Sequence, residues 1–228
     1  MKNDINYINI KKDDLYYKFM IIGSSYVGKT QILKRFCREE FEENYHPTFG
    51  MDFRVQKYFF ENSTITVQII EVSGKNIPPK ELLKAYILDA DCFLCIYDVS
   101  KRDSVSELNN IISDYESLIG NDNNKNQCWY FIGNKNDIIN RECSKNPADI
   151  FGYTPLGTIG FIEVSAKENT FIEKMFNNAI FQIKNIKRNI NNNLYNNIIN
   201  SFSQKINLKK EINQEPINQE NNKKCSIY

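Results

Sequence analysis

A short glycine-bounded segment constrains this chain more than any other feature. Residues 23–30 read Gly-Ser-Ser-Tyr-Val-Gly-Lys-Thr, which fits the pattern GxxxxGK[ST]. The apolar run 17–22 comes directly before it, and a stretch with helical spacing, 29–38, follows. A loop in this place directs backbone N–H groups to one point, and the helix amino terminus favours negative charge there. The segment therefore predicts a phosphate-binding loop.

Each part of this loop has a predicted task. Lys29 would reach the β- and γ-phosphates of a nucleotide, and Thr30 would offer its hydroxyl to a magnesium ion. A glycine-rich turn can fit the pattern by chance, but the strand before it and the helix after it argue against that alternative. The loop does not by itself select a base. Its predicted nucleotide-binding residues are Gly23, Ser24, Ser25, Tyr26, Val27, Gly28, Lys29 and Thr30.

Apolar runs that fit strands alternate with helical stretches from Leu15 onward, which is typical of an α/β fold. We expect roughly six strands and five helices over about 170 residues, in a doubly wound, mostly parallel sheet with helices on both faces. Of the strands, 53–60 and 64–71 read as a hairpin. The predicted strands are 17–22, 53–60, 64–71, 92–97, 128–133 and 161–164.

Two segments carry a single apolar stripe at three- and four-residue intervals, which predicts helices that pack on the sheet. The first stripe consists of Val105, Leu108, Ile111, Ile112, Tyr115 and Leu118. The second consists of Ile172, Met175, Phe176, Ala179, Ile180 and Ile183.

The ends of the chain differ from its middle. Residues 1–14 predict an N-terminal extension, 15–188 one domain, and 189–228 a low-complexity, disordered tail rich in asparagine. The first 17 residues lack the apolar core of a signal peptide, and no run approaches the roughly 18 apolar residues of a membrane span. A cytoplasmic protein is expected.

Composition excludes two other classes. Lysine and arginine total 29 against 28 for aspartate and glutamate, so no basic field indicates a nucleic-acid partner. The six cysteines lie far apart or inside apolar runs, which predicts reduced thiols. Cys92 and Cys95 form a CxxC pattern, but a strand would place them on opposite faces, which argues against a redox pair.

Two later clusters select the base. Asn134-Lys-Asn-Asp137 and Ser165-Ala-Lys167 each follow a predicted strand, and they resemble the NKxD and SAK motifs of small GTPases. The resemblance covers about residues 16–188 and is closest to the Rab branch. It implies a P-loop small G domain that binds GTP and GDP with Mg²⁺.

The resemblance also implies roles at the base. Asp137 would accept hydrogen bonds from the ring N–H and the exocyclic amine of guanine, and a site built for that pairing rejects adenine. Asn134 would support the loop and the base, the stem of Lys135 would cover one ring face, and Ala166 would offer its backbone N–H. The predicted guanine-binding residues are Asn134, Lys135, Asp137, Ser165, Ala166 and Lys167.

The segment 41–53 resembles the first switch of Rab proteins. Phe41 takes the place of the aromatic residue that packs beside guanine, and Tyr45 matches the residue that closes over the phosphates. Thr48 would bind Mg²⁺ in the GTP state. Alternatively, Phe41 is a core residue and Tyr45 a surface residue, and His46 reads as a solvated loop residue.

The second switch departs from the family. Where DTAGQ is usual, this chain has Glu71-Val-Ser-Gly-Lys75. Glu71 keeps a carboxylate near the metal, although its extra methylene would crowd or shift the water-mediated contact that the family makes there. The implied metal-site residues are Thr30, Thr48 and Glu71. Gly74 would sense the γ-phosphate with its N–H. Lys75 stands where a glutamine orients the attacking water, and it cannot accept that water's proton.

The implied catalytic group is therefore Lys29, Gly74 and Lys75, with weak intrinsic hydrolysis.

Residues 76–87 resemble the altered second switch of Rab twenty-eight, which also ends in a single-cysteine prenylation box. Tyr26 is bulky where the family keeps a small residue, which affects nucleotide affinity or the approach of an activating protein.

The chain ends Cys225-Ser-Ile-Tyr, a C-a-a-X pattern with two lysines just upstream. It predicts a prenylated Cys225 and reversible membrane association, since one prenyl chain anchors only marginally. An unmodified terminal cysteine is the alternative.

Together these features predict a Rab-like switch in vesicle trafficking, on the cytosolic face of an endomembrane. Its partners would be an exchange factor, a GTPase-activating protein and effectors that bind the switch segments. A pseudo-GTPase scaffold that does not hydrolyse GTP is the alternative, suggested by Tyr26, Glu71 and Lys75. A P-loop kinase would leave the two guanine motifs without a task.

Overall fold

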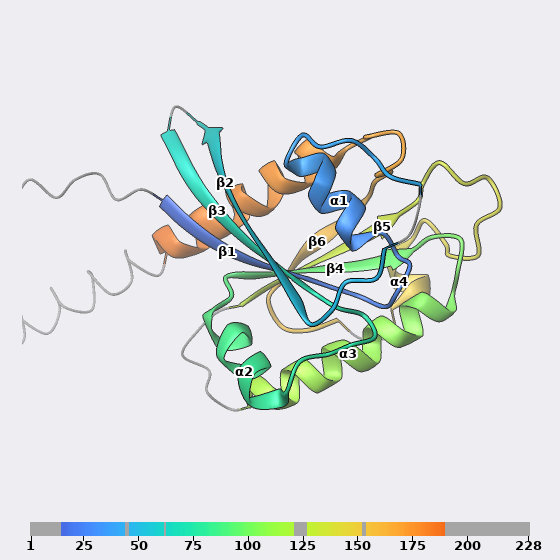
Figure 1. The fold of residues 1–228 in the computed structure, drawn as a ribbon, viewed down its shortest axis with the longest axis horizontal. Coiled ribbons are helices and arrows are strands. Elements are labelled where there is room, and N and C mark those ends of the chain that lie inside the picture. The colour runs from blue at the N-terminus through green and yellow to red at the C-terminus, as the bar shows by residue number, and fades with distance from the viewer. Residues whose placement is uncertain (1–14, 44–45, 62, 121–126, 152–153, 190–228) are drawn as a thin grey trace, which may run out of the picture. The chain divides into compact units, whose positions relative to one another are not determined.

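The computed structural model describes residues 15–43, 46–61, 63–120, 127–151 and 154–189. Within them, one sheet has the strand order β2-β3-β1-β4-β5-β6 (Figure 1). Its strands are β1 Leu15–Ile22, β2 Met51–Phe60, β3 Ser63–Val72, β4 Cys92–Asp98, β5 Cys128–Asn134 and β6 Thr158–Glu163. The β2/β3 pair is antiparallel and the other neighbouring pairs are parallel. The predicted α/β fold with a mostly parallel six-stranded sheet and one hairpin is confirmed.

The last strand begins three residues earlier than predicted. Gly160 lies inside β6 and has a φ of 147°, a conformation that a side chain rarely adopts. The register with β5 slips here, because Trp129 pairs with Thr158 while Tyr130 pairs with Gly160. A glycine at a bulge interrupts the apolar pattern, so the sequence alone placed the start of this strand too late.

Helices cover both faces of the sheet, as predicted (Figure 1). On one face lie α2 and α3, and on the other lie α1 and a helix that begins at residue 172. The labelled helices are α1 Lys29–Phe36, α2 Lys80–Asp89, α3 Asp103–Ile119 and α4 Pro147–Ile150. The chain divides into two compact units, Met1–Ile183 and Lys184–Tyr228, and the described residues of the second unit, 184–189, are helical.

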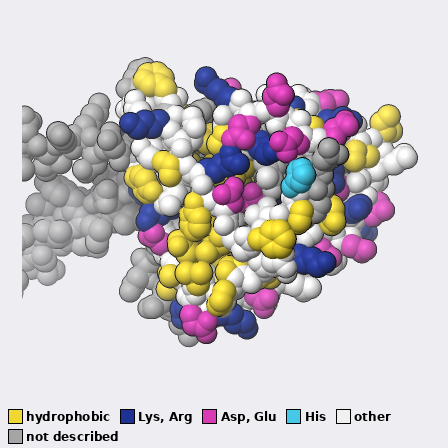
Figure 2. Space-filling model, viewed as in Figure 1, with side chains coloured by type: hydrophobic (Ala, Val, Ile, Leu, Met, Phe, Trp, Pro, Cys, Tyr) yellow, Lys and Arg dark blue, Asp and Glu magenta, His cyan; other side chains and the backbone are white. Residues whose placement is uncertain are grey.

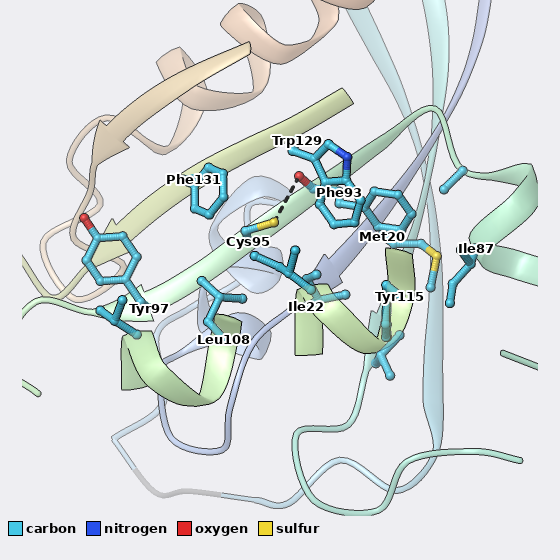
Figure 3. Packing of buried hydrophobic residues seen from close by; sticks show 14 of the residues in the cluster. Met20, Ile22, Ile87, Phe93, Cys95, Tyr97, Leu108, Tyr115, Trp129 and Phe131 are labelled. Carbon is cyan, nitrogen blue, oxygen red and sulfur yellow. Dashed lines mark hydrogen bonds between the residues drawn. The ribbon is translucent and has the colours of Figure 1, made fainter. Parts of the chain in front are cut away.

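Aromatic and aliphatic side chains fill the space between the sheet and α2 and α3 (Figure 3). Phe93 stacks on Trp129 with ring centroids 4.3 Å apart, and Tyr115 of α3 meets Phe93 edge-on at 5.8 Å. On the opposite face, Phe36 of α1 stacks on Phe176 at 3.7 Å. The burial of these rings stabilises the sheet between its two helical layers.

Both predicted apolar stripes face the sheet. In α3, the side chains Val105, Leu108, Ile112 and Tyr115 are buried, and Ile111 and Leu118 are partly buried against the same cluster. All six residues of the second stripe are at most 2% exposed. Helical periodicity thus predicted correctly which faces pack.

Cys92 and Cys95 are both fully buried in β4, and burial raises the pKa of both thiols well above the usual range. Their spacing along the strand places them on opposite faces, as predicted. No helix of the described residues is long and apolar enough to cross a membrane. Tyr45, Cys225, the extension 1–14 and the tail beyond residue 189 lie outside the described residues.

The parallel strands bring the predicted motifs to one edge of the sheet. The glycine-bounded loop follows β1, Glu71 lies near the end of β3, Asp98 ends β4 and Asn134 ends β5. Ligands of open α/β sheets bind outside the carboxyl ends of the strands. The topology therefore gathers residues far apart in sequence into one place.

Candidate functional site

A cavity of about 480 Å³ opens at this edge. Most residues predicted to bind nucleotide or metal line it: Ser25, Tyr26, Gly28, Lys29, Thr30, Phe41, Thr48, Glu71, Gly74, Asn134, Lys135, Asp137, Ala166 and Lys167. Gly23, Ser24, Val27, Ser165 and Lys75 are not among the lining residues. The predicted phosphate, metal and base residues thus share one cavity, and its size fits a small-molecule ligand.

Two glycines allow the phosphate-binding loop to approach its neighbours. Gly23 has a φ of 146°, and a Cβ there would lie 2.3 Å from the backbone oxygen of Ile96. Gly28 has a φ of 93°, and a Cβ there would lie 2.3 Å from Nδ2 of Asn134. Any side chain at either position would be strained and would collide, so the loop geometry requires both glycines.

Lys29 is buried beneath this loop. Its ammonium donates hydrogen bonds to the backbone oxygens of Gly23 (2.9 Å) and Ser24 (2.8 Å). Burial lowers the pKa of Lys29 to about 8, although the nearby Glu71 carboxylate opposes that shift. A cation held at this point, beneath the glycine-bounded loop, suits a polyphosphate.

Tyr26 is the unusual residue of the loop. It has a φ of 67°, in the left-handed region, and its side chain is 61% exposed while it lines the cavity. A tyrosine in this conformation costs about 1–2 kcal/mol of backbone strain relative to the right-handed region. The loop keeps its shape in spite of this residue.

Three oxygen-bearing side chains meet at the predicted metal position. Thr30 Oγ1 donates to Glu71 Oε1 at 2.5 Å, Thr48 Oγ1 donates to the same oxygen at 3.3 Å, and the two hydroxyl oxygens are 3.3 Å apart. Oxygen donors without nitrogen or sulfur suit a hard cation such as Mg²⁺.

Glu71 itself is only 1% exposed, and its Oε2 has no hydrogen-bond partner among the described residues. Burial raises the pKa of Glu71, and the hydrogen bond from Thr30, the charge of Lys29 and the hydrogen bond from Thr48 offset part of that rise. A buried carboxylate oxygen without a partner fits a bound cation. Glu71 is the one carboxylate of this set, and the described part of the chain has no group of three or more His, Cys, Asp or Glu side chains that could hold a metal.

The second switch contacts the phosphate-binding loop through Gly74. A Cβ at this position would lie 2.5 Å from the backbone nitrogen of Ser25. The hydroxyl of Ser73 accepts hydrogen bonds from the backbone N–H groups of Lys75 (3.3 Å) and Asn76 (3.0 Å), which folds the segment into a turn. The side chain of Lys75 is exposed and does not line the cavity.

At the other end of the cavity, Asn134 connects three segments. Its Nδ2 donates to the backbone oxygen of Val27 at 2.8 Å, and its Oδ1 accepts from the backbone N–H of Ala166 at 3.1 Å. Asp137 accepts a 2.6 Å hydrogen bond from the hydroxyl of Ser165. Ser165 thus positions the carboxylate predicted to read guanine, although it does not line the cavity.

Two charged residues near the base end escaped the sequence prediction. Asp98 is 1% exposed and forms an ion pair with Lys135 at 2.7 Å. Burial alone would raise its pKa, but hydrogen bonds from Lys135 and Ser100 hold the pKa of Asp98 below the usual range. Its place at the end of a buried strand was the signal that could have revealed it.

Arg141 is the second of these residues. Its guanidinium pairs with both carboxylate oxygens of Glu163, and its Nε donates to the backbone oxygen of Cys143 at 2.9 Å. The guanidinium also donates a 3.4 Å hydrogen bond to Asn136 Oδ1, which connects Arg141 to the loop that carries Asp137. No sequence pattern pairs Arg141 with a residue 22 positions away.

Comparisons with known proteins agree with this geometry. The Ras family model matches residues 18–185. The chain is 30% identical over 175 residues to the Ras-related protein Rab11A of Lotus japonicus, covering 77% of this chain and 75% of that protein. It is 28% identical to the GTP-binding protein ypt1 of Schizosaccharomyces pombe and 28% identical to the Ras-related protein Rab-1D of Dictyostelium discoideum. Each of these two matches covers 75% of this chain and 81% of the relative. This chain belongs to the Ras family of small GTPases.

Proposed function

We propose that this protein is a Rab-like GTP/GDP switch with weak intrinsic hydrolysis, which regulates vesicle trafficking through effectors. One observation carries the proposal: the residues that would select guanine and those that would hold the phosphates and the metal line the same cavity. The names of the relatives, Rab11A, ypt1 and Rab-1D, support a Rab-like protein.

The base would lie between Phe41 and the segments that carry Asp137 and Ala166. Asp137 would accept from the ring N–H and the exocyclic amine of guanine, and the backbone N–H of Ala166 would donate to its carbonyl. Adenine has no ring N–H and no exocyclic amine at the positions that would face Asp137, which is the physical basis of selection. The Lys135 stem would cover one face of the ring, and Lys167 would border it.

The phosphates would lie against the loop 23–30, where Lys29 is already directed at the loop interior. Thr30, Thr48 and Glu71 would hold Mg²⁺, which supplies charge neutralisation for the phosphate oxygens when bound. Tyr45, which would close over the phosphates, keeps its predicted role. Gly74 would donate its N–H to the γ-phosphate.

Hydrolysis is expected to be slow. Ras-type proteins turn over on the order of 10⁻⁴ per second even with a glutamine to orient the attacking water. Here Lys75 holds that position, is exposed and does not line the cavity, and an ammonium cannot accept the water's proton. An activating protein would therefore supply the missing group.

The surface offers a place for effectors. Exposed hydrophobic side chains lie on β2, on α2 and on the segment between β3 and α2, and Figure 2 shows such side chains gathered over this part of the molecule. They include Phe53, Val55, Ile77 and Leu82. The ring centroids of Phe53 and Tyr86 are 5.4 Å apart, so the patch extends from β2 to α2. Contiguous exposed apolar side chains indicate an interaction surface.

The remaining parts of the proposal follow the sequence. A prenyl group on Cys225 would bring the protein reversibly to the cytosolic face of an endomembrane, where an exchange factor would load GTP. The segment 76–87 supports a branch similar to Rab twenty-eight.

A pseudo-GTPase scaffold is the second candidate, favoured by the exposed Lys75. The test is to purify the full chain, release the bound nucleotide by denaturation and identify it by chromatography. Bound GDP supports a switch that turns over, whereas bound GTP supports a switch that is locked or depends on a partner for hydrolysis. Absence of any guanine nucleotide would contradict the switch and support an empty scaffold.

A further inference from the structure

The position of Glu71 fixes where its carboxylate can reach. Its backbone pairs with Ile21 of β1 on one side and with Asp52 of β2 on the other, so the sheet holds the Glu71 Cα at a fixed distance from the site. From this fixed point the side chain places Oε1 against both hydroxyls of the predicted metal site. A glutamate reaches one methylene further than an aspartate, so the carboxylate extends into the site.

The three oxygens resemble one face of a coordination octahedron. Mg²⁺ binds oxygen at about 2.1 Å, so neighbouring ligands of an octahedral ion lie about 3 Å apart. The triangle formed by Thr30 Oγ1, Thr48 Oγ1 and Glu71 Oε1 has edges of 2.5, 3.3 and 3.3 Å. The two 3.3 Å edges are close to this spacing, and the 2.5 Å edge is a hydrogen bond that would lengthen when an ion takes the place of its proton.

The second carboxylate oxygen points to the same conclusion. Glu71 Oε2 is buried and has no hydrogen-bond partner among the described residues. Direct coordination through Oε1 would place the buried negative charge of Glu71 against a cation, and a water bound to the same ion would lie within reach of Oε2 as a donor.

From this geometry we propose that Glu71 coordinates the metal ion directly, in place of a water molecule. The inference rests on the proposed nucleotide-binding function, because the ion would be bound together with the nucleotide. The protein then contributes a negatively charged ligand to the metal itself, and chelators should extract the ion more slowly than from a site with a water-mediated carboxylate.

The first test counts water molecules on the metal. The full chain is loaded with a non-hydrolysable GTP analogue and Mn²⁺, and the broadening of the Mn²⁺ resonance in ¹⁷O-enriched water gives the number of bound waters. With direct coordination, the Glu71→Asp protein should bind about one more water than the unmodified protein, because the shorter side chain withdraws from the ion. The matched control is Asp52→Asn, which alters the neighbouring carboxylate across the sheet and should leave the count unchanged.

A second measurement needs no variant. In protein made with ¹³C-labelled glutamate, electron–nuclear double resonance detects a carboxylate carbon bound to Mn²⁺ through a strong coupling, which a water-mediated carboxylate does not give. A strong coupling supports the inference. Equal water counts together with a weak coupling overturn it and leave nucleotide binding intact, whereas an unmodified chain that holds no guanine nucleotide overturns the proposed function and this inference together.

Discussion

The two ends of the cavity are built differently. At the base end, Asn134, Asp137 and Lys135 all bind other parts of the protein, and each is the residue type that the family motif requires. At the phosphate end, Glu71 keeps a buried oxygen without a partner, and Lys75 is exposed. The residues predicted to select the base are thus separate from those predicted to govern hydrolysis, and we expect that a substitution in one group can change its property without changing the other.

Removing the Asp137 carboxylate should have the largest effect. Asp137→Ala loses two hydrogen bonds from guanine to a charged group, which are worth about 3–5 kcal/mol together. We therefore expect GDP affinity to fall by a factor of roughly 100 to 1,000, measured by titration with a fluorescent nucleotide. Asp114→Ala, a change of an exposed carboxylate on α3, is the control, and equal losses in both variants would refute a base-reading role.

The stability of the base end should depend on Asn134. Asn134→Ala leaves the backbone oxygen of Val27 and the backbone N–H of Ala166 without their present partner, at about 2–4 kcal/mol in the free energy of unfolding. Thermal denaturation should show a melting temperature lowered by about 5–15 °C.

Asn136→Ala is the matched control for that experiment. It removes an exposed amide two positions away, whose Oδ1 accepts a long, 3.4 Å hydrogen bond from Arg141. Its melting temperature should stay within a few degrees of the unmodified protein. If both variants melted alike, Asn134 would not connect the three segments in solution.

A substitution of Lys75 at the phosphate end should change the rate of GTP hydrolysis and leave the affinity for GDP unchanged. Lys75→Gln supplies an amide that can orient water, so single-turnover GTP hydrolysis should rise about tenfold. GDP affinity should stay the same, because Lys75 does not line the cavity. Lys80→Gln, an exposed lysine at the start of α2, should leave the rate unchanged. An unchanged rate in Lys75→Gln would remove Lys75 from the position of the water-orienting residue.

The smallest effect is expected at Tyr26. Tyr26→Gly relieves a left-handed backbone strain, and after the entropy cost of glycine it should stabilise the protein by about 0.5–1 kcal/mol. Arg38→Gly, at a φ of 62° outside the cavity lining, should stabilise it similarly. Chemical denaturation checks both. Only Tyr26→Gly should also speed GDP release, by about threefold, because it removes part of the cavity wall.

Local patterns predicted the fold well. The stripe from Val105 to Leu118 and the stripe from Ile172 to Ile183 both pack on the sheet, because helical spacing reports directly which side is buried. The start of β6 was predicted too late, because a glycine such as Gly160 inside a strand interrupts the apolar pattern. The roles of the site residues came from motifs and remain predictions, but their gathering in one cavity follows from the order of parallel strands.

Long-range pairs could not be predicted. Arg141 with Glu163, and Lys135 with Asp98, join segments that no periodicity relates. The hydrogen bond from Thr30 to Glu71 spans 41 positions and depends on the start of helix α1 lying beside the end of strand β3. Such contacts arise only from the assembled fold, which a single sequence does not reveal.

The close approach of Gly74 to Ser25 has a consequence for how freely the two loops can move. The two loops meet backbone to backbone with no room for a methyl group between them. A substitution as small as Gly74→Ala would force them apart, so a shift of either loop at this joint would displace the other.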